Sequence, residues 1–192
     1  MPVALYVDTE RGPYPALGVD CWDIDRDATK YDGPWPVVAH PPCQDWGTLR
    51  CFALDLPERK ACGPAAVEQV RRWGGVLEHP AGSHLWNAKS MALPGGGQQD
   101  MWGGWSVEVD QCDWGHPARK TTWLYIVGCQ PSQMPPQPQP RKPTHVIAPA
   151  RTAAARAAAR GKHIPKSRRH LTPPEFASWL LQVAAVCKQR TP

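Results

Sequence analysis

Proline and glycine limit the folds that this chain can adopt. Its 192 residues include 23 prolines and 16 glycines, which together make up about a fifth of the sequence. Proline lacks the amide hydrogen that a helix interior needs, and glycine lowers helix stability, so long packed helices are disfavoured. The composition therefore argues against a helical bundle. The length is that of one ordinary domain with a short appendage.

Short apolar runs predict strands, and two segments predict helices. A helix is expected over about 64–73, with Gly74 and Gly75 as its stop, and a second follows the capping box at 172–175. Strands separated by crossover segments favour an α/β fold with a mostly parallel sheet. The expected strands are 3–7, 18–22, 35–39, 76–78 and 122–127. The apolar residues of the second helix are Phe176, Trp179, Leu180, Val183 and Val186.

Three parts can be distinguished along the chain. Residues 1–130 carry the strand signals and are expected to form the α/β domain. Residues 131–170 form a proline-rich and basic arm, in which 131–149 should be extended and 150–170 should become helical only on a polyanion. Residues 171–192 are expected to dock on the domain as a C-terminal helix.

Charge is divided unevenly between these parts. Residues 1–113 hold 16 acids and 9 bases, net −7, whereas residues 114–174 hold 11 bases and no acid, net +11. A purely basic stretch is the electrostatic signature of a polyanion partner, so we expect binding to nucleic acid, first of all DNA. The alternative is a solubilising segment without a partner.

Seven cysteines and the absence of a long apolar run bear on location. The longest apolar run is only a few residues, and the first residues lack the layout of a signal peptide, so no membrane association is expected. An odd cysteine count without a secretory signal is typical of reduced thiols in a cytoplasmic protein. The oligomeric state is left open.

Four segments occur in an informative order. Residues 23–31 read Asp-Ile-Asp-Arg-Asp-Ala-Thr-Lys-Tyr, and residues 40–47 read His-Pro-Pro-Cys-Gln-Asp-Trp-Gly. Residues 77–80 read Leu-Glu-His-Pro, and residues 113–128 run from Asp-Trp-Gly-His-Pro-Ala-Arg-Lys to Tyr-Ile-Val-Gly. At these residues the chain resembles the cytosine-C5 DNA methyltransferase family, over roughly residues 3–128. The resemblance implies a shortened Rossmann-like methyltransferase core.

The resemblance also implies a reaction, in which a thiolate adds to C6 of a pyrimidine and makes C5 nucleophilic. Cys43 would be that thiolate, on a loop after a strand, where parallel sheets place ligands. Glu78 would hold the Watson–Crick edge of a base that has left the duplex. Arg119 and Lys120 would orient the substrate and supply positive charge near the thiol.

Further residues are assigned to substrate and cofactor. The family uses S-adenosylmethionine as its cofactor, and the acids expected near it are Asp8, Asp23 and Asp25. Trp46 and Trp114 are expected to stack on bases, the histidines to lie near the thiol, and the arm cations to contact phosphates. The full set of expected substrate-binding residues is His40, Gln44, Trp46, His79, Trp114, Arg141, Lys142, Arg168 and Arg169.

The chain departs from the family pattern and leaves alternatives open. The family's glycine-rich loop after the first strand is replaced by residues 8–14, with one glycine and a rigid proline, and 31–40 is too short for the family's third strand. One alternative is a DNA-binding or accessory protein with a degenerate core. Another, from His40-Pro41-Pro42-Cys43, is a methyltransferase acting on amino groups. A third is a zinc protein, although no Cys-x-x-Cys pair supports it. The residues that this alternative would use are Cys43, Cys51, Cys62, His79, His84, Cys112 and His116. Because the zinc alternative lacks that support, no metal ligand is assigned.

Overall fold

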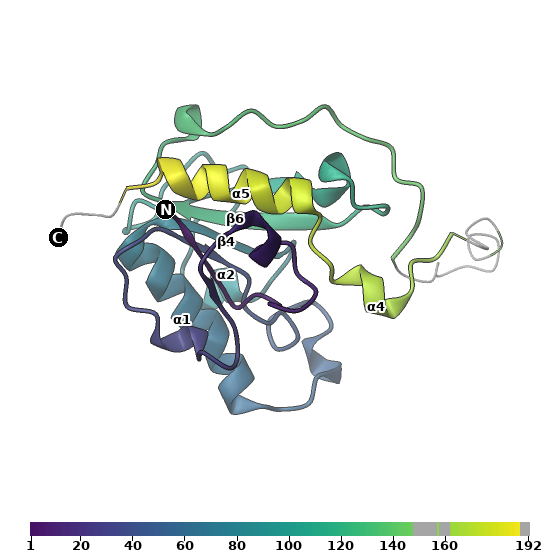
Figure 1. Ribbon diagram of the computed structural model, residues 1–192, viewed down its shortest axis with the longest axis horizontal. Helices are drawn as coiled ribbons and strands as arrows, with labels where there is room; N and C mark the ends of the chain where they lie inside the picture. The colour runs from purple at the N-terminus through teal and green to yellow at the C-terminus, as the bar shows by residue number, and fades with distance from the viewer. Residues whose placement is uncertain (148–156, 158–161, 189–192) are drawn as a thin grey trace.

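A six-stranded sheet forms the centre of the molecule (Figure 1). A computed structural model describes residues 1–147, 157 and 162–188. The sheet has the order β2-β1-β3-β4-β6-β5; its first four strands are mutually parallel, and β6 runs antiparallel to both of its neighbours. The expectation of an α/β fold with a mostly parallel sheet is thus confirmed. The strands are β1 (Val3–Leu5), β2 (Cys21–Trp22), β3 (Val37–Ala39), β4 (Gly75–Pro80), β5 (Trp105–Asp110) and β6 (Thr121–Val127).

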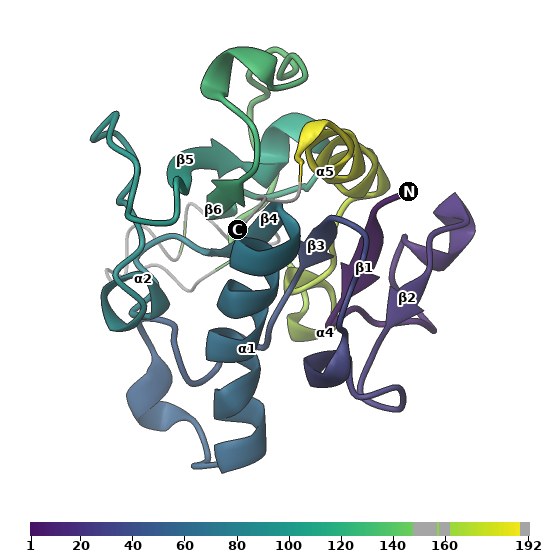
Figure 2. The ribbon, with the colours of Figure 1, turned by 90° about the vertical axis from the view of Figure 1, so that its left-hand side faces the viewer.

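One long helix covers each face of the sheet (Figure 2). Side chains alternate along β4, so that Val76 joins the core under α5 (Pro174–Val186) and Leu77 joins the core under α1 (Pro57–Trp73). Two further α-helices are short, α2 (Leu85–Ala88) and α4 (Lys166–Arg169). The 3₁₀ turns are Pro15–Leu17, Ala28–Lys30, Arg50–Phe52, Gln111–Trp114 and Pro131–Gln133. None of the helices in the described part of the chain is long and apolar enough to cross a membrane.

Helix α1 begins at Pro57, well before the expected start near Pro64. Pro57 suits the first turn, because its fixed φ is helical and its missing N–H would be unpaired there anyway. Pro64 lies inside the helix and cannot donate to the carbonyl of Lys60, one turn earlier. The indole Nε1 of Trp46 donates to that carbonyl at 3.0 Å. A side chain from the loop after β3 thus satisfies the group that the proline leaves free.

Helix α5 completes one of the two cores. Its side chains Phe176, Trp179, Leu180 and Val183 are buried against the sheet, whereas Val186 at its last turn is exposed. The chain continues past α5 as Lys188, whose N–H donates to the carbonyl of Gly128 at 2.9 Å. The C-terminal helix is therefore an integral part of the domain.

The arm is attached to the domain at several points. His145 pairs with Ala118 of the domain, and the N–H of Arg141 donates to Asp113 at 2.8 Å. The bridge between Val146 and His163 joins two parts of the arm itself. Ile164 is buried, so the segment after the bridges also packs. Most of the region expected to become helical on a polyanion, 148–156 and 158–161, lies outside the described residues. Within the described part, Lys166–Arg169 forms one short helix.

The contact between Trp46 and Lys60 can be tested by a double-mutant cycle. Trp46→Phe removes the indole donor and leaves the Lys60 carbonyl unpaired, so we expect a loss of about 1–2 kcal/mol in the free energy of unfolding. In a Pro64→Ala background the new amide hydrogen can bond the same carbonyl, and the loss should shrink to less than half. Urea denaturation of the four proteins measures this coupling; an equal loss in both backgrounds would contradict it.

Candidate functional site

The topology of the sheet places a ligand position at one edge. From β1 the chain first goes to β2 on one side and then to β3 on the other, so the strand order reverses between the neighbours β1 and β3. In open α/β sheets, ligands bind outside the carboxyl ends of the strands at such a reversal. His40 and Cys43 follow β3 at this edge, and Glu78 lies in the carboxyl-terminal half of β4.

A continuous set of hydrogen bonds crosses this edge. The Nδ1 atom of His40 lies 2.9 Å from Oε2 of Glu78, and its Nε2 atom lies 2.6 Å from the hydroxyl of Tyr14. The Nε2 amide of Gln111 donates to Oε1 of Glu78 at 3.0 Å and to Oγ1 of Thr122 at 3.0 Å. An ionised carboxylate only accepts, so His40 donates through Nδ1 and Tyr14 donates to Nε2 when the ring is neutral.

These contacts keep the buried Glu78 charged. Burial by itself raises the pKa of this carboxyl, but the hydrogen bond and charge of His40, with help from Lys120, outweigh it and lower the pKa to about 2. The Tyr14 hydroxyl is fully buried, and burial next to the Glu78 charge raises its pKa well above the ordinary value. At neutral pH the site therefore holds a carboxylate and a protonated phenol.

Cys43 lies half-buried beside this network. Burial raises the pKa of its thiol, and the Glu78 carboxylate raises it further, whereas the Lys120 ammonium lowers it. The three groups are thus close enough to act on one another, as the resemblance implies. The net effect keeps the thiol protonated at neutral pH, which differs from the lowered pKa expected of an activated nucleophile.

Lys120 and Arg119 reach different surroundings although they are adjacent. The Nζ of Lys120 donates to the carbonyls of His170 and Leu171, each at 3.4 Å, in the segment that leads into α5. The largely exposed Arg119 pairs with Asp110, Nε to Oδ2 at 3.0 Å. Lys120 therefore belongs to the site, and Arg119 lies at the surface beside it.

The acids expected near the cofactor stabilise turns. The Oδ1 of Asp8 accepts the N–H groups of Glu10 and Arg11. Both oxygens of Asp23 are engaged, one by Thr9 Oγ1 at 2.6 Å and the other by backbone N–H groups, and the Thr9 bond lowers the pKa of Asp23. Asp25 is exposed.

The loop after β1 does not reproduce a glycine cradle for S-adenosylmethionine. Gly12 donates to the Asp8 carbonyl at 3.0 Å, and a Cβ atom at Gly12 would lie only 2.2 Å from that oxygen. The loop is closed on itself by this contact, and its single glycine serves its own turn. These residues do not fit the cofactor in the manner of the family.

Three expected substrate-binding residues have structural roles. Trp114 is buried, with ring centroids 4.7 Å from Trp179 and 5.1 Å from Phe176, so the expectation that it stacks on a base is wrong. His79 is fully buried on the opposite face of the sheet from Glu78 and bonds Ser83 Oγ at 2.8 Å; it cannot touch a substrate. Trp46 holds the loop to α1, as described above.

The residues expected to contact phosphates differ in whether their side chains are bonded to other parts of the protein. Arg141 pairs with Glu175 at 3.3 Å, and Arg169 donates to the carbonyl of Ile164 at 3.0 Å. Lys142 and Arg168 are exposed. Gln44, next to Cys43, is exposed as well and is free to meet a ligand at this edge.

Sequence reasoning missed three residues of the network. Tyr14 stands in the loop that replaces the glycine cradle, and Gln111 and Thr122 flank the turn between β5 and β6. Strand β5 was not predicted, so no spacing linked Gln111 to Glu78. The contact between Gln111 and Glu78 can be recognised only after the antiparallel pairing of β6 with β4 is known.

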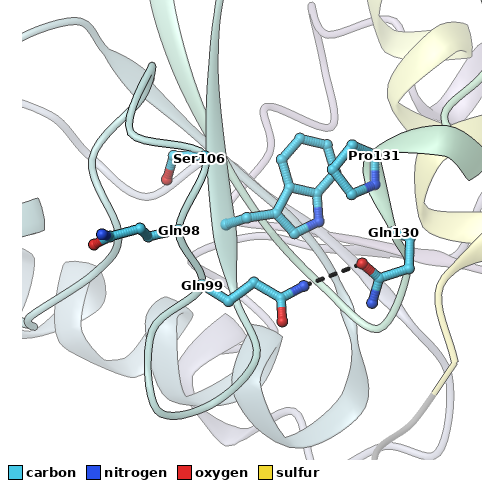
Figure 3. A pocket seen from close by; sticks show the side chains of 7 residues that line it. Gln98, Gln99, Ser106, Gln130 and Pro131 are labelled. Carbon is cyan, nitrogen blue, oxygen red and sulfur yellow. Dashed lines mark hydrogen bonds between the residues drawn. The ribbon is translucent and has the colours of Figure 1, made fainter.

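A shallow pocket lies elsewhere, at the beginning of β5 (Figure 3). It is lined by uncharged side chains, among them Trp105, Ser106 and Pro131, and the amide of Gln99 donates to that of Gln130 at 3.2 Å. Trp105 is in register with Ile126, and Ile126 with Val76, near the amino end of β4. The pocket is therefore at the opposite edge of the sheet from Cys43.

Comparisons with known proteins add no family. No family model matches the chain, and neither the curated proteins nor the solved structures contain a match. Within residues 1–147 and 162–188, no group of three or more His, Cys, Asp or Glu side chains is arranged to hold a metal ion. The zinc alternative therefore has no support in the described structure.

Acid should destabilise the protein through His79. Burial lowers the pKa of His79 to about 4 from an ordinary value of 6.5. The unfolded chain therefore binds the proton more tightly, and the stabilising contribution is complete above pH 6.5 and is lost as the pH falls toward 4. Between pH 7.5 and pH 5, we expect about 2 kcal/mol of stability to be lost through this group.

Urea denaturation at the two pH values measures this loss. His79→Gln should remove most of the difference, because no imidazole remains to be protonated. The matched control His84→Gln, at a half-exposed histidine, should retain it. Equal pH dependence in the wild type and His79→Gln would contradict the assignment.

Proposed function

We propose that this chain binds nucleic acid and adds the Cys43 thiolate to C6 of a pyrimidine base, as a shortened Rossmann-like relative of cytosine-C5 DNA methyltransferases. The observation that carries the proposal is the gathering of Cys43, Glu78 and Lys120 at the carboxyl edge, next to the reversal of strand order. The amino-acid composition alone would not predict that these three side chains lie close together. They are three of the four residues that the resemblance makes catalytic.

Glu78 is suited to hold a base edge. A carboxylate offers about four lone-pair positions, and His40 and Gln111 occupy one on each oxygen. One position on each oxygen is left for donors on a pyrimidine, such as the exocyclic amino group of cytosine. Because the flanking bonds fix the carboxylate, little ordering is needed when the base arrives.

Base binding would also activate Cys43. In the free protein the Glu78 charge raises the pKa of the thiol. Donors of the bound base partly neutralise that charge, so the effect of Lys120 gains weight and the thiolate becomes more populated. The thiolate would then form the bond to C6, and the electrons of the C5–C6 double bond would move to C5, which takes up a proton from solvent.

The order of segments along the sheet supports the methyltransferase-like assignment. The four segments that carry the resemblance lie after β2, after β3, within β4, and over the turn before β6 together with β6 itself. Between β2 and β3 the chain forms only the turn Ala28–Lys30, so a third strand is missing there. S-adenosylmethionine is the methyl donor that the resemblance implies, but the loop after β1 does not fit it, and we derive no step through it.

A second candidate function is DNA binding without catalysis. The raised pKa of Cys43 and the unsuitable loop after β1 both favour it. Both functions use the basic arm and differ only in whether Cys43 forms a covalent bond. An experiment on the first bond-forming step separates them.

Proton exchange at C5 tests the covalent step without any cofactor. While the thiolate is attached to C6, C5 takes up a deuteron from D₂O; loss of the original proton and release of the thiolate then return a deuterated pyrimidine. We expect the DNA to gain deuterium at C5, detected by mass spectrometry after digestion to nucleosides. Cys43→Ser should abolish the gain, whereas Cys62→Ser, at a half-buried cysteine in α1, should leave it intact.

The pH dependence identifies the thiol. Because the pKa of Cys43 is raised, the exchange rate should increase with pH across the range 7–9. Lys120→Met should slow exchange several-fold at pH 7.5 and less at pH 9, since it raises the pKa of the thiol further; Arg119→Met should have little effect. If the protein binds DNA fully but no exchange occurs at any pH, the covalent step is refuted and only the non-catalytic function remains.

Salt tests the nucleic-acid partner. Each phosphate neutralised by Lys or Arg releases condensed counterions, so the logarithm of the affinity should fall linearly with the logarithm of salt concentration. If about five of the arm cations contact DNA, raising salt from 50 to 200 mM should weaken binding by a few hundred-fold. Fluorescence anisotropy with a labelled duplex measures the slope; an unchanged affinity would refute the contacts.

A further inference from the structure

Two cysteines from distant parts of the sequence meet where α5 ends. Cys129 is the second residue after β6, and Cys187 is the first residue after α5. Between them in space, the N–H of Lys188 donates to the carbonyl of Gly128 at 2.9 Å. The cysteines are the chain neighbours of this bonded pair. Both belong to the core under α5, where each is 5% exposed.

The backbone at this meeting point is held closely. Gly128 has a φ of +98°, and a Cβ atom there would lie only 2.3 Å from the carbonyl oxygen of Lys188. A glycine is therefore needed for the two segments to approach this far. The carbonyl of Cys129 accepts a hydrogen bond from Nε1 of Trp105 at 2.8 Å, and the N–H of Cys187 donates to the carbonyl of Ala184 at 3.1 Å. Both cysteines thus start from fixed backbone positions.

The two thiols also act on each other. The hydrogen bond from the Cys187 thiol lowers the pKa of Cys129, although burial opposes this effect. The same contact and burial raise the pKa of Cys187. Such a difference suits a pair in which one thiol is oxidised first and the other resolves it. Burial instead raises the pKa of four other cysteines, Cys21, Cys43, Cys62 and Cys112.

We propose that Cys129 and Cys187 form an oxidative modification site, at which hydrogen peroxide produces a disulfide that fastens the end of α5 to β6. The Cys129 thiolate attacks the peroxide, which gives a sulfenic acid and a hydroxide ion. The sulfur of Cys187 then attacks the oxidised sulfur, the S–S bond forms, and the hydroxyl group leaves with the Cys187 proton as water. The hydroxide ion takes the proton that Cys129 released. Two thiols are oxidised to one disulfide, and one peroxide is reduced to two waters.

The position of the pair suits a small oxidant. Val186, in the last turn of α5, is exposed, and helix ends open at little cost in free energy. An S–S bond of roughly 2.05 Å requires the two side chains to turn toward each other. The Sγ atom of Cys187 lies 3.8 Å from the carbonyl of Gly75, at the start of β4. The pair is therefore at the opposite edge of the sheet from Cys43, and the proposal does not depend on the chemistry of Cys43.

The disulfide would change how α5 is retained. Helix α5 completes one of the two cores, and in the reduced protein noncovalent contacts alone hold it on the sheet. With the disulfide, the basic arm and α5 become one loop that is fastened covalently at both ends. Closing a long loop removes entropy from the unfolded chain and stabilises the folded one.

Treatment of the reduced, full-length protein with hydrogen peroxide tests the site. We expect the intact mass to fall by two hydrogens, and digestion to give one cross-linked peptide pair that joins Cys129 to Cys187. The urea midpoint should rise by about 1–2 M, because the closed loop is long. Dithiothreitol should reverse both changes, and Cys129→Ala should show neither.

Cys112→Ala is the matched control, because Cys112 is another buried cysteine. It should keep both the cross-link and the rise in the urea midpoint. The peptide map of the wild type keeps the test valid if Cys129→Ala does not fold. Oxygen added at Cys129 without a cross-link, or a cross-link between other cysteines, would overturn the proposal and leave the pair as core packing. A correct cross-link that lowers the urea midpoint would refute the fastening of α5.

Discussion

Glu78 retains its charge inside the protein because two hydrogen-bond donors and one nearby positive charge, from three different parts of the chain, stabilise its carboxylate. The donors are His40, from the loop after β3, and Gln111, from the turn between β5 and β6; the charge is that of Lys120, directly before β6. An isolated buried carboxylate would instead take up a proton. The antiparallel placement of β6 between β4 and β5 brings Gln111 and Lys120 to Glu78, so the electrostatics of the site depend on the topology of the sheet.

Strands with apolar runs could be predicted from local sequence, whereas the edge strand β5 and the antiparallel direction of β6 could not. Apolar runs around Val38, Val76 and Ile126 are buried strands as expected, and Gly74 ends α1 as expected. Strand β5 was missed because Trp105–Asp110 mixes polar and apolar residues at a sheet edge, where only one partner strand is present. The early start of α1 was missed because an interior proline is tolerated only through a tertiary contact from Trp46.

Residues of the candidate site could be predicted where their chemical groups are reactive or charged. They could not be predicted where their role depends on how the rest of the chain packs around them. Cys43, Glu78 and Lys120 come together, since loops at the carboxyl ends of parallel strands converge. Trp114 was misassigned because an indole suits base stacking and core packing equally well, and only the approach of α5 decides between them. Tyr14 and Gln111 carry no signal in the sequence, because their roles consist of single hydrogen bonds across long sequence separations.

The N–H of Val146 donates to the carbonyl of Lys162 at 2.8 Å, and the N–H of Ile164 donates back to the carbonyl of Val146 at 3.1 Å. His145 pairs with Ala118 on one side of these bonds, and Ile164 is buried on the other, so both backbone positions are fixed against the rest of the protein. Helix α5 follows and packs on the sheet. A backbone cut between residues 146 and 162 would therefore leave two fragments that stay associated through these contacts, with α5 still completing its core.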